Sequence, residues 1–164
     1  MELGCGVGFT GLHLLATSTS KNIKSYIFTD CHKTVLEAVN FNIMINLIKT
    51  KPSQEVLVTS AESGPPSVDV PFPWTHLASI NDGCTTVQVE KLDWIATDNT
   101  KHGYEEEGID LLLGADIVYE RSLIQPLVQV ISNILRQNAN ANCYICCTER
   151  SGKYNSIIET GIVG

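Results

Sequence analysis

The sequence has 164 residues, 43% of them apolar and 18% charged, and its formal net charge at pH 7 is −7. These proportions are typical of one globular domain, and no apolar run reaches the roughly 18 residues of a membrane-spanning helix, so we expect no membrane association. The acidic balance argues against direct binding of nucleic acid, which relies on clustered Lys and Arg. It favours a small molecule or a basic protein segment as the partner.

Apolar segments rich in β-forming residues predict the strands. They lie at Glu2–Leu3, 25–29, 87–92, 109–115 and 143–148. Several of these segments are apolar throughout, which is typical of parallel strands that are covered on both faces.

Periodic apolar positions between the strands predict three helices, at 10–17, 33–47 and 122–137. In the third helix, Ser122 and Gln125 have the spacing of a capping box, and Pro126 falls in or next to the first turn, where a proline costs least. The alternation of strands and helices predicts right-handed βαβ units in an α/β fold, a Rossmann-like, doubly wound and mostly parallel sheet. A ligand crevice would then lie at the carboxyl ends of the strands.

Residues 50–86 interrupt this alternation. They contain several Pro and Gly residues and show no sustained period, so we predict a long irregular loop, with a brief strand at 55–59. Loops of this length are either functional or disordered, and the sequence leaves both interpretations open.

Six cysteines are present, and their distribution does not resemble a disulfide framework. Cys143 and Cys146 form a C-x-x-C motif, which occurs in redox and zinc sites. Because the motif lies within a predicted strand and no second cysteine pair or histidine cluster completes it, we interpret both as buried strand residues in a reduced compartment. We predict no metal site.

The stretch Glu2-Leu3-Gly4-Cys5-Gly6-Val7-Gly8 places glycines between a strand end and a helix. Glycine is needed where the backbone turns sharply or where a ligand approaches the main chain closely. A dinucleotide fingerprint counted from Gly4 would require glycine at position 9, where this chain has Phe9. The observed spacing is G-x-G-x-G, and the alternative is a turn with only a structural role.

Asp30 ends the next predicted strand. A carboxylate in this place can accept two hydrogen bonds from the vicinal hydroxyls of a ribose. The alternative is a cap for the helix at 33–47, because Asp is a favoured N-cap residue.

Two further strand ends carry candidate site residues. After strand 87–92, Trp94 could lie against an adenine ring and Asp93 could accept from its amine, although Trp94 could equally be a core residue at the rim. After strand 109–115, Asp116 is a carboxylate at the exposed end of an apolar strand, with Tyr119 three residues on.

Together these elements resemble the seven-strand, S-adenosylmethionine-dependent protein-lysine methyltransferases. Residues 27–32 (IFTDCH) and the pattern Val35-Leu36…Asn42…Asn46 are most similar to the eukaryotic elongation factor 2 lysine methyltransferase group. Asp116-Ile117-Val118-Tyr119 matches the family's D-x-x-Y substrate motif, which is more specific than the glycine turn.

The resemblance implies a class I methyltransferase fold, S-adenosyl-L-methionine as cofactor and a lysine of a protein substrate, with elongation factor 2 as the first candidate. It implies that Asp116 and Tyr119 act as catalytic residues that face the target lysine. The positions that would contact the cofactor are Glu2, Gly4, Cys5, Gly6, Gly8, Asp30, Asp93, Trp94 and Ala115.

Two departures from the family accompany the match. The first strand is nearly missing and the terminal strands of the family have no counterpart, so we expect a single partial domain over 1–164, truncated at both ends.

The alternative function is an inactive methyltransferase-like remnant that acts as a binding module or has no activity. A nicotinamide-dependent oxidoreductase and a nucleic-acid methyltransferase stay open but are disfavoured. We expect a cytoplasmic monomer, since the start lacks a secretory pattern.

Overall fold

The computed structural model describes residues 1–17, 23–48, 74–80, 83–96 and 108–148, and the statements below concern these ranges. They form six strands and three α-helices. In chain order these are β1 (Glu2–Leu3), α1 (Phe9–Ala16), β2 (Ser25–Asp30), α2 (Lys33–Ile48), β3 (Trp74–Ile80), β4 (Gly83–Lys91), β5 (Leu111–Ala115), α3 (Ile124–Leu135) and β6 (Asn142–Cys146).

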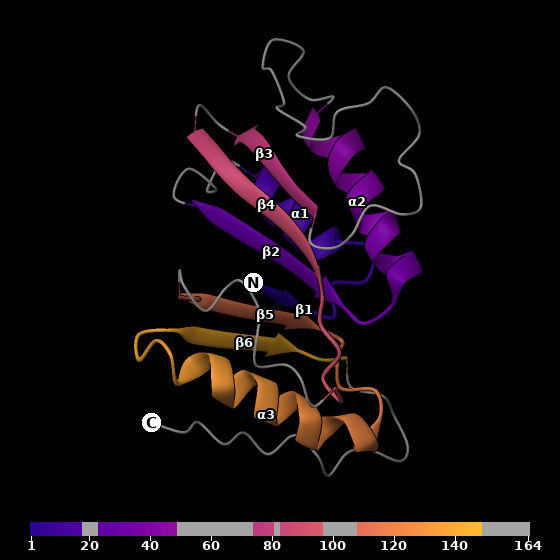
Figure 1. The fold of residues 1–164 in the computed structure, drawn as a ribbon, viewed down its shortest axis with the longest axis vertical. Helices are drawn as coiled ribbons and strands as arrows, with labels where there is room; N and C mark the ends of the chain where they lie inside the picture. Colours follow the sequence, from indigo (N-terminus) through magenta and orange to yellow (C-terminus); the bar gives the residue numbers. More distant parts are fainter. Residues whose placement is uncertain (18–22, 49–73, 81–82, 97–107, 149–164) are drawn as a thin grey trace.

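The strands make one sheet in the order β3-β4-β2-β1-β5-β6, in which only β3 runs antiparallel to its neighbour. Figure 1 shows α2 beside β2 and β4, and α3 alongside β5 and β6. The predicted doubly wound, mostly parallel α/β sheet is therefore confirmed. Within the described ranges, every helix is too short or too polar to cross a bilayer.

β1 is only two residues long, yet it lies in the middle of the sheet, between β2 and β5. Glu2 pairs with Phe28 of β2 on one side and with Leu113 of β5 on the other. The chain passes from β1 to β2 on one side and later reaches β5 on the other, so the carboxyl end of β1 is the topological switch point where ligands bind in such sheets. The glycine turn begins at this point.

The core has two parts, which correspond to the two faces of the sheet. Leu3, Leu112 and Leu127 belong to the cluster beside α3, and Phe28 and Val39 belong to the cluster beside α1 and α2. Leu3, Leu112, Phe28 and Val39 are completely buried. Burial of apolar side chains on both faces explains why the parallel strands have continuous apolar sequences.

The prediction of an irregular loop over 50–86 was wrong for its last part, which forms β3 and the start of β4. These strands pair as a hairpin whose register brings Ile80 opposite Gly83. Only Asn81 and Asp82 separate the strands in sequence, and Asn and Asp are favoured turn residues, a signal that outweighed the lack of a clear period. The predicted strand at 55–59 lies outside the described residues.

The predicted capping box of the third helix was also wrong. α3 begins at Ile124, after a 3-10 turn at Arg121–Leu123, without a side-chain cap, and the Ser122 hydroxyl donates to the Glu120 carboxylate instead. A helix capped by Ser122 would place Pro126 fourth in the helix, where its missing N–H would remove the first helical hydrogen bond. A start one residue later makes Pro126 the third residue of the helix. At this position a backbone N–H would have no helical partner, so its absence in proline costs no helical hydrogen bond.

Gly11 lies in α1 against side chains of β2, and we expect Gly11→Ala to destabilise the fold. A methyl group there would lie 2.4 Å from Phe28 Cε1 and 2.6 Å from Tyr26 Cε1. Overpacking of this kind costs about 1–3 kcal/mol, which exceeds the ~1 kcal/mol that alanine gains from helix propensity. Urea unfolding would measure the difference. As a control, Ala16→Gly at an exposed position of α1 should cost about 1 kcal/mol at most; a more stable Gly11→Ala variant would contradict the close packing.

Candidate active site

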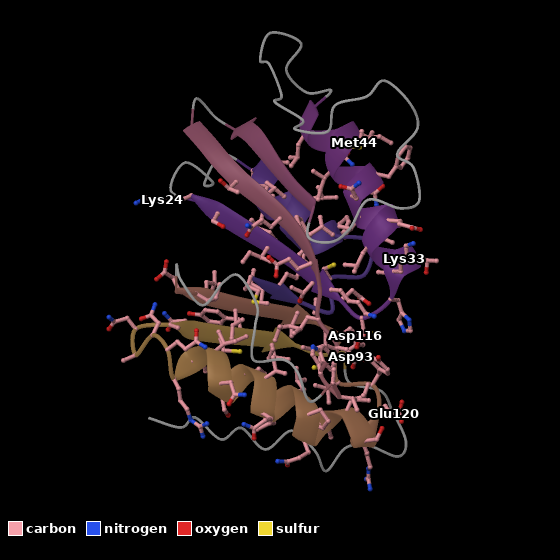
Figure 2. The ribbon with its side chains drawn as sticks, viewed as in Figure 1. Lys24, Lys33, Met44, Asp93, Asp116 and Glu120 are labelled. Carbon is pink, nitrogen blue, oxygen red and sulfur yellow. The ribbon has the colours of Figure 1, made fainter. Side chains whose placement is uncertain are left out.

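The predicted site residues meet at the carboxyl edge of the parallel strands. The glycine turn follows β1, Asp30 ends β2, Trp94 follows β4 and Asp116 follows β5. Figure 2 shows Asp93 and Asp116 at this end of the sheet, and Lys24, just before β2, at the opposite end. The fold thus brings together residues as far apart in the sequence as Gly4 and Asp116, a separation of 112 positions.

The three glycines of the turn all have left-handed backbone conformations. The φ angles of Gly4, Gly6 and Gly8 are +57°, +53° and +82°. A methyl group on Gly8 would lie 2.3 Å from Val39 Cγ2, whereas one on Gly6 would meet no atom within 4 Å. Gly8 is therefore required by packing, and Gly6 faces open space in which a ligand can approach the backbone.

Asp30 contacts the glycine turn directly. Its Oδ2 accepts a hydrogen bond from the Gly6 N–H at 3.3 Å, and its Oδ1 accepts one from the His32 N–H at 3.0 Å. The carbonyl of His32 accepts the first bonds of α2, from Val35 and Leu36, so His32 and not Asp30 occupies the cap position. A carboxylate has about four acceptor sites, so Asp30 keeps lone pairs for a further donor.

Glu2 lies beneath the turn and not at its open side. It is 2% exposed, and its Oε2 accepts a hydrogen bond from the Tyr26 hydroxyl at 2.9 Å. Burial raises the pKa of Glu2, and hydrogen bonds from Tyr26, Gly11 and Thr10 oppose that rise. These partners connect β1, β2 and the start of α1, so the geometry suits Glu2 to support of the turn.

Trp94 and Ile117 pack over the first glycine. A methyl group on Gly4 would lie 2.9 Å from Ile117 Cγ2 and 3.5 Å from Trp94 Cζ2. Trp94 is half-buried against the core cluster beside α3, so the indole is both a rim residue of the core and a wall of the site. Asp93 stabilises the same loop, because its Oδ1 accepts a hydrogen bond from the Ile95 N–H at 3.0 Å.

Asp116 has an unusual backbone for a residue other than glycine. Its φ is +56°, a conformation that costs most residues about 1–2 kcal/mol and that Asp and Asn adopt more readily than others. Its N–H donates to the Cys146 carbonyl at 2.7 Å, and Ile117 turns back into the core, where it is 3% exposed. This chain reversal leaves the Asp116 side chain exposed at the edge of the sheet.

Ala115 and Tyr119 lie on either side of this reversal. Both are exposed, and the exposed fraction of Tyr119 is 54%. Partial burial raises the pKa of Tyr119, with further contributions in the same direction from Cys31, Asp30 and Glu120. Tyr119 follows the carboxyl end of β5 and Asp30 lies at that of β2, so both are at the same edge of the sheet.

The cysteines of β6 differ from their predicted environment. Cys143 is half-buried and Cys146 is exposed, so the prediction that both are buried was wrong. The reason is that β6 is an edge strand of the described sheet, with β5 as its neighbour on one side. The five cysteines whose side chains are described are free, and no group of three or more potential metal ligands gathers within the described part of the chain.

Comparison with known proteins identifies the family. A family model described as lysine methyltransferase matches residues 77–160, just over half of the chain. The chain belongs to this family.

Relatives support the same assignment along nearly the whole chain. The protein-lysine N-methyltransferase EEF2KMT of Bos taurus is 29% identical over 98% of this chain, and that of Homo sapiens is 28% identical over 98%. An uncharacterised protein of Dictyostelium discoideum is 31% identical over 97%. These matches cover 42%, 41% and 40% of the relatives, so the chain spans about two fifths of the length of the curated relatives it matches.

In this member of the lysine methyltransferase family, the sequence interpretation missed one residue that contacts the glycine turn. The side-chain amide of Asn42, on α2, donates to the carbonyl of Val7 in the glycine turn at 2.9 Å. The only sequence signal was the position of Asn42 in the family-like pattern after Asp30, because residues 35 positions apart reveal no contact by periodicity.

The buried carboxyl group of Glu2 predicts a particular pH dependence of stability. Burial raises its pKa in the folded chain above the ordinary value of 4.5. The unfolded chain therefore loses this proton first as the pH rises, and the contribution of Glu2 to the free energy of unfolding falls until the pH passes the folded pKa. Glu2→Gln removes this titration while an acceptor for Tyr26 remains.

We expect the free energy of unfolding of the unmodified chain, relative to Glu2→Gln, to decrease as the pH rises from about 4.5 upward. Urea denaturation of both proteins at a series of pH values would measure the difference. A difference that does not change with pH would show that the folded and unfolded chains ionise Glu2 alike.

Proposed function

We propose that this chain binds S-adenosyl-L-methionine at the carboxyl edge of its sheet and transfers the methyl group to a lysine of a protein substrate. The observation that carries the proposal is the open side of Gly6, a left-handed residue with no atom within 4 Å of a potential Cβ, next to the Asp30 carboxylate. Membership of the lysine methyltransferase family supports the reaction class.

The residues at this edge suit the chemical groups of the proposed cofactor. Asp30 retains acceptor sites for ribose hydroxyls, and the turn from Gly4 to Gly8 exposes backbone where a Cβ would obstruct a ligand. Trp94 offers an aromatic wall beside Gly4, with Asp93 next to it as a possible acceptor for an amine. Cys5 and Ala115 would contribute backbone contacts, while Glu2 would act from below, through the turn.

When bound, the cofactor supplies a methyl group that is already electrophilic because it is attached to a sulfonium. The chain's own task is to align a neutral amine, and such positioning can supply roughly 7–11 kcal/mol of the barrier. Lysine has an ordinary pKa of about 10.4, and a partly desolvated channel lowers it. The Asp116 carboxylate favours the charged amine, so we assign it to capture and orientation, and Tyr119 to the wall of the channel.

Elongation factor 2 is the substrate that we propose to test first. The proposal rests on the resemblance of residues 27–32 to the elongation factor 2 lysine methyltransferase group, and on the similarity to proteins named EEF2KMT in three mammals. A cytoplasmic, monomeric protein is part of the same proposal, which cell fractionation and light scattering would check.

Calorimetric titration with S-adenosylmethionine tests the cofactor site. We expect Asp30→Ala to weaken binding by tenfold or more, about 1.4 kcal/mol, because the acceptor for the ribose hydroxyls is lost. Glu37→Ala is the control, since it removes a carboxylate that forms an exposed ion pair with Lys33 on α2. A folded chain that does not bind the cofactor would favour the alternative function of an inactive binding module.

Asp116 and Tyr119 are expected to affect methyl transfer and not cofactor affinity. Asp116→Asn keeps a side chain that tolerates the left-handed backbone but removes the negative charge, so we expect kcat/KM for a lysine peptide to fall about tenfold or more. Tyr119→Phe should cause a smaller loss. Radiolabelled methyl incorporation would measure both, and equal losses of cofactor affinity would contradict the assignment to the substrate.

A further inference from the structure

We propose that Asn42 is a positioning residue that holds the Val7–Gly8 peptide of the glycine turn in one orientation and thereby sets the affinity of the turn for its ligand. The second part of this inference rests on the proposed function, because it takes S-adenosylmethionine as that ligand. The evidence is the hydrogen bond from the Asn42 side-chain amide to the Val7 carbonyl, 2.9 Å long.

The position of Val7 explains why such a bond is needed. Val7 lies between Gly6 and Gly8, which both have left-handed backbones, and its own side chain is 58% exposed. Because glycine rotates easily between left- and right-handed conformations, a peptide plane next to a glycine can turn over at low cost. Packing of the Val7 side chain does little to prevent this, so the restraint comes from hydrogen bonds at the two ends of this peptide. The Gly8 N–H donates to the Cys5 carbonyl within the turn, and the Asn42 amide at the Val7 carbonyl is the restraint that comes from outside it.

The direction of that restraint suits ligand binding. With the carbonyl of Val7 held by α2, its partial negative charge is directed to the Asn42 amide. If the peptide turned over, this oxygen could point instead into the open space beside Gly6, where the ligand would approach. An unpaired carbonyl in that space would have to be desolvated on binding, which disfavours the complex.

Two other contacts fix the position of the turn, one with α2 and one within the turn itself. Val39, three residues before Asn42 on the same helix, fills the space that a side chain at Gly8 would need. The Gly8 N–H donates to the Cys5 carbonyl at 2.9 Å, which closes the turn above this contact. Asn42 therefore adds orientation to a turn whose position is already set by packing.

A matched control lies one helical turn away. The Asn46 side-chain amide donates to the backbone carbonyl of Asn42 at 2.8 Å, within α2 itself. Asn42→Ala and Asn46→Ala remove the same atoms from the same helix, but only the first removes a hydrogen bond to the glycine turn. Asn42→Asp is the third variant, because it keeps the shape of the side chain and loses the donor.

The experiment compares the unmodified chain with Asn42→Ala, Asn42→Asp and Asn46→Ala in two measurements. Amide spectra and hydrogen exchange of the ligand-free chain report on the turn through Gly6 and Gly8. We expect shifted resonances and faster exchange of the Gly8 amide in both Asn42 variants, and no change at these glycines in Asn46→Ala. Calorimetry with S-adenosylmethionine should then show about tenfold weaker binding for Asn42→Ala, at least as weak for Asn42→Asp, and parent-like binding for Asn46→Ala.

Each result decides a part of the inference. Unchanged Gly6 and Gly8 amides in the Asn42 variants would overturn it, whatever the cofactor does. Altered amides with parent-like cofactor affinity would overturn the claim that the bond serves ligand binding. If the unmodified chain does not bind S-adenosylmethionine while the amides respond as expected, the proposed function fails and the orienting role of Asn42 stands. If Asn42→Ala and Asn46→Ala lower the melting temperature equally but only Asn42→Ala weakens binding, the loss of affinity does not come from a loss of helix stability.

Discussion

Attachment of the glycine turn to β2 and α2 is the constraint on which the site depends. The N–H of Cys5 donates to the Thr29 carbonyl at 2.8 Å, and the N–H of Gly6 donates to Asp30 at 3.3 Å. The carbonyl of Val7 accepts a hydrogen bond from the side chain of Asn42 on α2. Three consecutive residues of the turn are thus held by the next βα unit, so a turn that has little side-chain packing of its own keeps a defined backbone.

The loop after β5 is attached by packing. Ile117 fills the space above both Gly4 and Gly114, because a methyl group on Gly114 would lie 2.4 Å from Ile117 Cδ1. This side chain anchors the loop between β1 and β5, and Asp116 beside it must adopt a left-handed backbone. Strain of this kind persists only where the surrounding structure determines it, which here means the Ile117 contacts and the hydrogen bond to Cys146.

Two carboxylates near the turn illustrate how environment separates roles. Glu2 is buried with Tyr26 as its partner, and its pKa is raised by burial, so it acts as part of the fold. Asp30 accepts from two backbone amides at the rim and keeps acceptor sites toward the open space. The same type of side chain therefore supports the turn from below in one case and is available to a ligand in the other.

Local patterns in the sequence were sufficient to predict the alternating strands and helices, the doubly wound sheet and the meeting of Gly6, Asp30 and Asp116 at one edge. Periodicity, turn chemistry and the rule that parallel strands end at a common edge are properties of short segments, so they can be read without knowing contacts. Only the tertiary structure decided that Glu2 faces inward, that Cys146 is exposed on an edge strand, and that Asn42 reaches Val7. Each of these depends on which distant segment lies opposite, and neither residue type nor spacing carries that information.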